Sequence, residues 1–135
     1  MIGILVVTHG KLAQGFKHAS EMIAGKADQF GVLGLSEGEN IEDFKNKVSK
    51  KISDLNSGKG VIVLCDLFGA SPYNVTLQSY PKLKSSVEYE IVSGVNLPMI
   101  IETILERRNY DNLAHLVAHI AEVGKSAIRI QNFNF

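Results

Sequence analysis

Hydrophobic positions along the chain fall into two alternating patterns, short unbroken apolar runs and longer stretches in which apolar residues recur every three or four positions. The first pattern is typical of buried strands and the second of amphipathic helices. We expect strands at 2–7, 30–35, 61–65, 86–92 and 126–130, and helices at 11–24, 41–55, 72–80, 97–107 and 111–122. This order predicts an α/β fold, a doubly wound and mainly parallel sheet with helices on both faces. We expect residues 1–135 to form a single domain.

The stretch from Val61 to Pro72 combines a buried strand with a polar turn and a helix start. Asp66 follows the apolar run directly, and Gly69 marks the turn. Ser71 is expected to be the N-cap and Pro72 the first helical residue. In open α/β sheets ligands bind beyond the carboxyl ends of the strands, and helix N-termini there favour anions. We therefore expect the functional site at this position.

Other boundaries follow from local signals. Asn40 or Ser36 is expected to cap the helix after the second strand, and Asn96 and Asp111 the last two helices. Pro81 and Gly124 are expected to end their helices. Arg129 would be unfavourable in a buried strand, so the segment 126–130 is expected at a sheet edge.

Composition narrows the class of protein. The 14 basic and 14 acidic side chains cancel, so no overall charge favours nucleic acid or an anionic membrane surface. The single cysteine, Cys65, lies inside an apolar strand, which indicates a reduced, buried thiol and a cytoplasmic protein. The apolar start, residues 1–7, is too short to span a bilayer and lacks preceding basic residues.

A second polar residue, His9, follows the first strand as Asp66 follows the third. These two strands commonly lie side by side in such sheets, which would bring the two side chains together. A carboxylate that accepts one ring N–H leaves the other nitrogen free to attack a phosphoryl group. The amides of Gly69 and Ala70 and the hydroxyl of Ser71 would then hold the transferred phosphoryl group. This chemistry requires neither a metal nor a cofactor.

The remaining histidines have simpler interpretations. His115 and His119 lie four residues apart with Glu122 near them, a spacing that could hold a metal. No cysteine or acidic cluster completes such a site, so we expect a solvated helix face. Thr8 and Gly10 are expected to shape the loop around His9. Phe68 is either packed on the core or available to protein partners.

Three motifs together resemble the mannose-type enzyme IIA of the bacterial phosphoenolpyruvate-dependent sugar phosphotransferase system. They are Thr8-His9-Gly10, the stretch from Asp66 to Asn74, and the stretch from Ser93 to Pro98. The resemblance covers nearly the whole chain and implies that His9 is the phosphorylated residue, Asp66 its orienting partner and Ser71 part of the phosphoryl-binding helix end. Ala70 departs from the second glycine of many members, which matters only if the turn needs a positive φ.

The resemblance also implies partners. His9 would accept phosphate from the phosphocarrier protein HPr and pass it to a IIB component that serves the membrane IIC/IID complex. Members form homodimers in which the C-terminal strand pairs with the partner's sheet. The chain's end at Phe135 favours a separate IIA subunit. Two other functions stay open: the phosphoryl-donor subunit of dihydroxyacetone kinase, and a binding module that holds a small anion without turnover.

Overall fold

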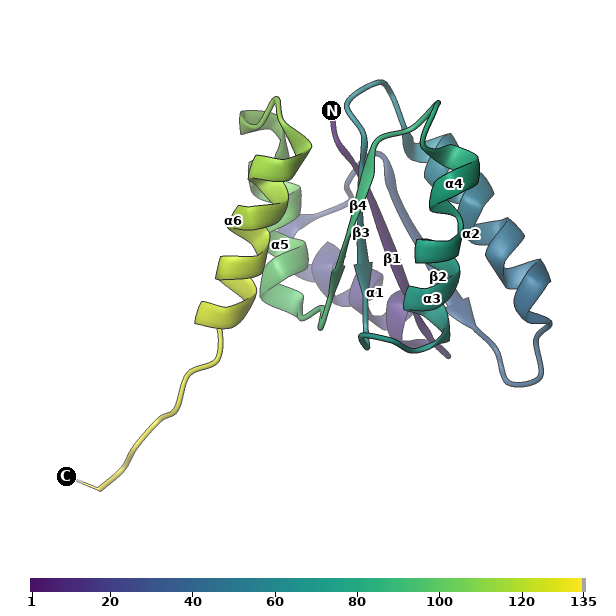
Figure 1. The fold of residues 1–135 in the computed structure, drawn as a ribbon. Coiled ribbons are helices and arrows are strands. Elements are labelled where there is room, and N and C mark those ends of the chain that lie inside the picture. Colours follow the sequence, from purple (N-terminus) through teal and green to yellow (C-terminus); the bar gives the residue numbers. More distant parts are fainter. Residues whose placement is uncertain (135) are drawn as a thin grey trace.

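The computed structural model describes residues 1–134, which contain a four-stranded, wholly parallel sheet (Figure 1). Its strand order is β2-β1-β3-β4, so β1 lies between β2 and β3. The predicted adjacency of the first and third strands is therefore confirmed. The strands are β1 (Gly3–His9), β2 (Phe30–Leu35), β3 (Val61–Cys65) and β4 (Tyr89–Ser93).

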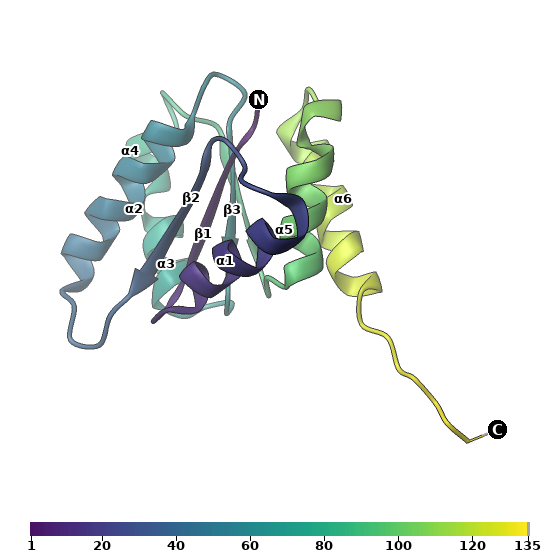
Figure 2. The same cartoon turned by 180° about the vertical axis from the view of Figure 1, so that it is seen from behind.

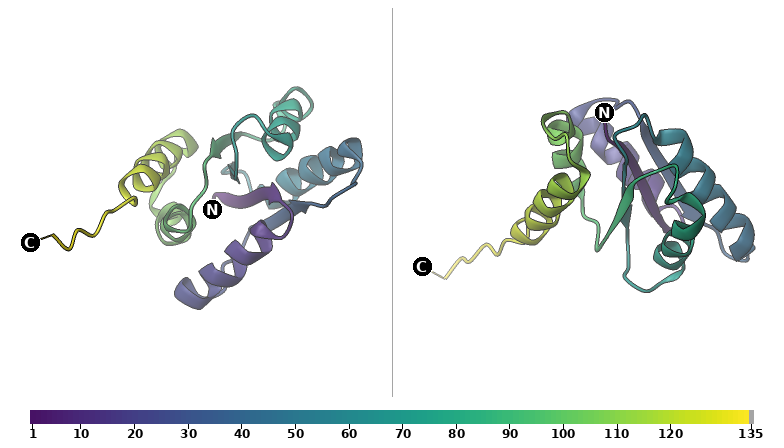
Figure 3. Two further views of the ribbon diagram at one scale, coloured as in Figure 1. Left: turned by 90° about the horizontal axis from the view of Figure 1, so that it is seen from below. Right: turned by 45° about the horizontal axis from the view of Figure 1, so that its top comes forward.

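Helices cover both faces of the sheet, which confirms the predicted doubly wound class. One face carries α2 (Ile41–Leu55), α3 (Ser71–Gln78) and α4 (Tyr80–Leu83). The opposite face carries α1 (Leu12–Ala24), α5 (Leu97–Glu106), the short 3₁₀ helix η1 (Arg107–Asn109) and α6 (Leu113–Ser126). Seen from behind and from below, the two helix layers lie on opposite sides of the strands (Figures 2 and 3).

The strand side chains alternate between two cores, as the period of a strand requires. Leu5, Val7 and Val63 pack in the core that includes residues of α2 and α3. Ile4 and Ile62 pack in the core formed with α5 and α6. Because β1 and β3 are buried on both faces, their sequences are continuous apolar runs, the pattern from which they were predicted.

Two predicted helix caps are confirmed and one is displaced by a residue. The side chain of Asn40 accepts a hydrogen bond from the backbone N–H of Asp43 at 3.0 Å, and that of Asn96 accepts one from Met99 at 3.1 Å. Asn112, rather than Asp111, caps α6 by accepting from His115 N–H at 3.1 Å. Asp and Asn are both common N-cap residues, and Asn112 is the cap because α6 begins at Leu113.

Three predicted helix boundaries were wrong. Ser71 is the first residue of α3 rather than its N-cap, which is Ala70, and its side chain makes no capping hydrogen bond. Pro81 lies in the first turn of α4, where its missing N–H is tolerated, so the chain continues as a second short helix. Gly124 lies inside α6 and does not end it. A glycine fits there because a Cβ would come within 2.6 Å of Met99 Sδ.

The segment 126–130, predicted to be a final edge strand, forms no strand within the single chain. Ser126 is the last residue of α6, and residues 127–134 form neither helix nor strand (Figure 1). The segment extends away from the sheet, with Ile128 and Ile130 exposed. A strand needs a neighbouring strand, and this segment has none within the described part of its own chain. Within residues 1–134, no helix combines the length and the apolar character needed to cross a membrane.

Candidate active site

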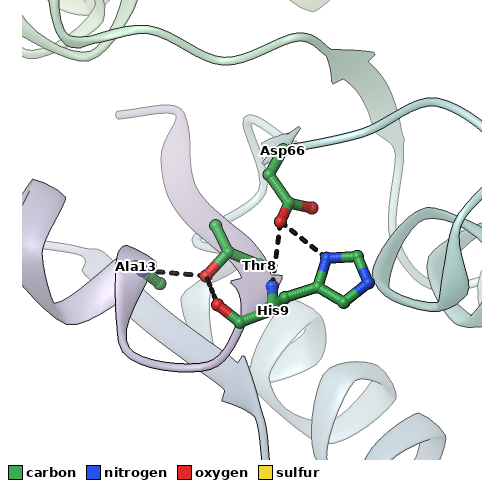
Figure 4. Close-up of polar contacts among 4 residues, drawn as sticks. All are labelled: Thr8, His9, Ala13 and Asp66. Atoms are coloured by element: carbon green, nitrogen blue, oxygen red, sulfur yellow. Dashed lines mark hydrogen bonds and ion pairs between the residues drawn. The ribbon is translucent and has the colours of Figure 1, made fainter.

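The carboxyl ends of β1 and β3 bring His9 and Asp66 into direct contact (Figure 4). Val7 pairs with Cys65 across the two strands, so the chain places His9 and Asp66 just beyond that pair. His9 Nδ1 lies 2.7 Å from Asp66 Oδ2, and the backbone N–H of His9 donates to the same oxygen at 2.9 Å. His9 is the last residue of β1, whereas the sequence interpretation placed it just after the strand. The predicted contact is confirmed.

The surroundings of Asp66 keep its carboxylate ionised. Burial by itself would raise the pKa of Asp66, but the hydrogen bonds from the His9 backbone and ring outweigh it, and the pKa is lowered. The side chain of Asp66 is 13% exposed and that of His9 is 49% exposed. Asp66 therefore acts as a fixed anion behind a ring that solvent and partners can reach.

The ring of His9 presents its second nitrogen away from Asp66 (Figure 4). With a proton on Nδ1 donated to the carboxylate, Nε2 carries a free lone pair. A neutral imidazole held in this way is a nucleophile, because the carboxylate stabilises the positive charge that develops on the ring during attack.

Thr8 fixes the backbone on the other side of His9. Its hydroxyl donates to the carbonyl oxygen of His9 at 3.0 Å and accepts from the N–H of Ala13 at 2.8 Å (Figure 4). The side chain is completely buried. The sequence interpretation counted Thr8 only as a loop-shaping neighbour, although one hydroxyl at the end of an aliphatic strand was a signal for a specific polar contact.

The residues predicted to bind a phosphoryl group lie at the start of α3. Gly69 has a φ of 78°, and Ala70 has a φ of −90°, so the alanine is unstrained and only the glycine needs its conformational freedom. Ser71 begins the helix, and the N–H groups of a first turn have no acceptor inside the helix. These groups follow Asp66 by three to five residues, on the loop that leaves β3.

A groove of about 520 Å³ lies beside His9, between the end of β1 and the loop from β2 to α2. Leu35, Glu37, Glu39 and Ile41 line it together with His9. On the loop after Asp66, Phe68 is 72% exposed and its ring centroid lies 4.8 Å from that of Tyr73. Phe68 therefore contacts one ring but is not packed on the core, and its availability to a protein partner stays a prediction.

Two further side chains that could be reactive, Cys65 and His119, lie outside the contact between His9 and Asp66. Burial raises the pKa of the Cys65 thiol to about 12, so this cysteine stays protonated beneath the site. His119 Nε2 lies 2.7 Å from Glu102 Oε2, and the ring stacks on Tyr110. In residues 1–134 no three His, Cys, Asp or Glu side chains are grouped so that they could hold a metal ion.

Comparisons with known proteins identify the family. A family model named EIIA-man, described as "PTS system fructose IIA component", matches residues 3–121. The mannose-specific EIIAB component of Escherichia coli K12 is 31% identical over 128 residues, 95% of this chain. The chain spans 39% of the length of that relative.

The solved structures that resemble this chain include IIA proteins of the phosphotransferase system. A phosphotransferase system EIIA from Streptococcus agalactiae is 25% identical with a TM-score of 0.88, and the match covers 96% of this chain and 97% of that one. A PTS IIA protein associated with the fucose utilization operon of Streptococcus pneumoniae is 35% identical with a TM-score of 0.79, over 95% and 91% of the two chains.

The fold and the comparisons define the class as the IIA components of the sugar phosphotransferase system, and the contact between His9 and Asp66 is consistent with it. Within that class, the chain belongs to the EIIA-man family. The predicted resemblance to the mannose-type IIA proteins is confirmed.

Proposed function

We propose that this chain is a phosphoryl carrier in which His9 Nε2 accepts a phosphoryl group from HPr and passes it to a IIB component. The observation that carries the proposal is the 2.7 Å contact between His9 Nδ1 and Asp66 Oδ2, since it leaves Nε2 as the reactive atom. Family membership supports the same role. Residues 1–135 would act as one IIA domain in the cytoplasm, without a metal or cofactor.

In the transfer step, the Nε2 lone pair forms a bond to phosphorus while the bond between phosphorus and the donor breaks. The electron pair of the broken bond leaves with the donor, and no oxidant or reductant is involved. Asp66 stabilises the imidazolium character that develops as Nε2 attacks. The reverse displacement, with the acceptor as nucleophile, delivers the phosphoryl group to IIB.

The start of α3 would stabilise the phosphorylated state. A phosphohistidine carries a charge of about −2. The N–H of Ala70 already donates to the carbonyl oxygen of Leu67 at 3.3 Å, and Pro72 has no N–H. The N–H groups of Gly69, Ser71 and Tyr73 and the hydroxyl of Ser71 would concentrate partial positive charge without forming a covalent bond. Such groups stabilise the anion and still release it to the next acceptor.

We further propose that the chain is a homodimer in which the C-terminal segment 127–130 pairs with the partner's sheet. Two observations support this: the apolar side chains of Ile128 and Ile130 are exposed, and β4 is an edge strand. Pairing along β4 would satisfy the backbone groups of both elements.

The test is intact-protein mass spectrometry after incubation with phosphoenolpyruvate, enzyme I and HPr at neutral or basic pH. One added phosphoryl group, lost in acid and absent from His9→Ala, is expected. Undiminished labelling of His9→Ala would overturn the role of His9. No added mass with verified donors would favour the anion-binding module. Transfer of the phosphoryl group to a dihydroxyacetone kinase and not to IIB would favour the role of phosphoryl-donor subunit of that kinase.

A further inference from the structure

Thr8 places a hydroxyl at a completely buried position at the end of a strand whose other buried side chains are aliphatic. Burying a hydroxyl is unfavourable unless its hydrogen bonds are made. Here both are made, to the carbonyl oxygen of His9 at 3.0 Å and from the N–H of Ala13 at 2.8 Å. A valine would fill nearly the same volume without this requirement, so packing alone does not account for a threonine.

The bond to Ala13 replaces a missing helix cap. The N-cap of α1 is Lys11, whose side chain makes no capping hydrogen bond. Ala13 is the second residue of that helix, a position whose N–H usually donates to the oxygen of a capping side chain. The Thr8 hydroxyl supplies this bond from the preceding strand and so joins the end of β1 to the start of α1.

The bond to His9 completes the restraint of the proposed nucleophile. The N–H of His9 is held by Asp66 at 2.9 Å, and its carbonyl is held by Thr8. The next residue, Gly10, has a φ of 53° and donates its own N–H to Leu35 at 2.7 Å. The peptide groups on both sides of His9 are therefore fixed, and side-chain rotation remains the main freedom of the imidazole.

We propose that Thr8 is a positioning residue for phosphoryl transfer, acting through the backbone of His9 and not on the phosphoryl group itself. The proposal rests on the proposed function of His9. If the His9 carbonyl were released, the glycine after it would let the turn shift and the distance from Nδ1 to Asp66 vary. Because transfer needs Nε2 in line with the breaking bond, a misplacement of about 1 Å can slow it by up to a hundredfold.

Two matched pairs of variants isolate the hydroxyl. Thr8→Val removes the hydroxyl and keeps the shape of the wild-type side chain. Thr8→Ala and Thr8→Ser both lose the methyl group, and only the serine keeps the hydroxyl. The hydroxyl effect is thus measured twice, and the second pair serves if the valine variant does not fold.

The first readout is the rate of phosphorylation per folded molecule at saturating phospho-HPr, well below the unfolding temperature of each variant. We expect Thr8→Val to be slower than wild type by about tenfold or more, and Thr8→Ala slower than Thr8→Ser by a similar factor. The KM for phospho-HPr should change little, since Thr8 is buried and cannot touch the donor.

The second readout is the ¹⁵N spectrum of the His9 ring, assigned with a His9→Gln chain. Wild type and Thr8→Ser should show the neutral ring protonated on Nδ1, whereas Thr8→Val should show a mixture of tautomers. A residue that only stabilised the fold would change the unfolding temperature and neither readout. Equal rates and equal tautomer populations within both pairs would overturn the proposal. If wild type itself were not phosphorylated, the proposed function would fail instead.

Discussion

Asp66 accepts two hydrogen bonds from His9 on a single carboxylate oxygen, one from the backbone at 2.9 Å and one from the ring at 2.7 Å. The first fixes the strand end and the second fixes the imidazole, so one side chain sets both the position and the orientation of the proposed nucleophile. The other oxygen, Oδ1, is buried and has no protein partner among residues 1–134. We therefore expect Asp66 to act on His9 through its negative charge and through the orientation of its hydrogen bonds, more than through packing.

Replacing Asp66 with asparagine should slow phosphorylation of His9 without abolishing it. The amide keeps nearly the same shape and can still accept from His9, but it no longer stabilises positive charge on the ring. We expect the rate to fall by about tenfold to a hundredfold. Rapid-quench labelling by phospho-HPr would measure it.

The matched control is Asp111→Asn, which removes a fully exposed carboxylate that lies 3.5 Å from Lys59 Nζ. It should leave the phosphorylation rate unchanged. A rate for Asp66→Asn equal to that of this control would contradict the orienting role of Asp66.

The lowered pKa of Asp66 predicts how the stability of the fold depends on pH. The unfolded chain has an ordinary aspartate pKa of about 3.9, and the folded pKa is lower, so the unfolded state binds protons more readily. The stabilisation is therefore present above about pH 4, decreases as the pH falls through the interval between the two values, and is absent below the folded pKa.

Urea titrations of wild type and Asp66→Asn across this acidic range would measure the difference in free energy of unfolding. Below about pH 4, the difference should change in favour of the variant as the solution is acidified. Titrating groups that do not contact Asp66, including Glu39 with its own lowered pKa, contribute equally to both chains. A difference that stays constant down to about pH 2 would contradict the assigned direction.

The exposed apolar side chains after α6 predict an effect on assembly. Ile128 is 80% exposed and Ile130 is 92% exposed, so replacing both with serine should leave the single chain folded. If the segment pairs with the partner's sheet, the double variant should sediment as a monomer at concentrations where the wild type is a dimer. Ile23→Ser, at a 62% exposed site on α1, is the control and should not change the mass. A monomeric wild-type chain would rule out the proposed dimer.

The sheet and the His9–Asp66 pair could be predicted because each depends on local signals and one topological rule. Buried parallel strands are apolar runs, polar residues directly after them lie at the carboxyl edge, and strands one and three are usually neighbours. No contact between distant segments had to be inferred beyond that rule.

The features that sequence reasoning missed depend on contacts between distant segments. Arg107 is only 2% exposed, and its guanidinium donates to the carbonyl oxygens of Ile2, Asp28 and Gln29. From the sequence it was only the end of a helix. Gly124 was predicted to end its helix. The sequence does not show that the Met99 side chain, from another helix, packs against this position and leaves no room for a Cβ. The segment 126–130 carries a strand-like pattern, but the described chain offers it no strand to pair with.

A substitution at Gly34 should affect both the stability of the fold and the phosphorylation of His9, because Gly34 lies on β2 opposite Thr8. A Cβ at this position would overlap the carbonyl oxygen of Gly10, which is backbone and cannot move without shifting the turn after His9. We expect Gly34→Ala to lower the free energy of unfolding by about 1 to 3 kcal/mol and to slow phosphorylation of the molecules that remain folded.

Gly15→Ala is the matched control, since Gly15 lies inside α1 and a Cβ there would meet no atom within 4 Å. This change should stabilise the fold by about 0.5 to 1 kcal/mol, through helix propensity alone, and leave the rate unchanged. Chemical denaturation and rapid-quench labelling on both variants separate the two effects. Normal stability and rate for Gly34→Ala would show that the turn tolerates displacement, and that the backbone of His9 is not held as tightly as its contacts with Asp66 and Thr8 imply.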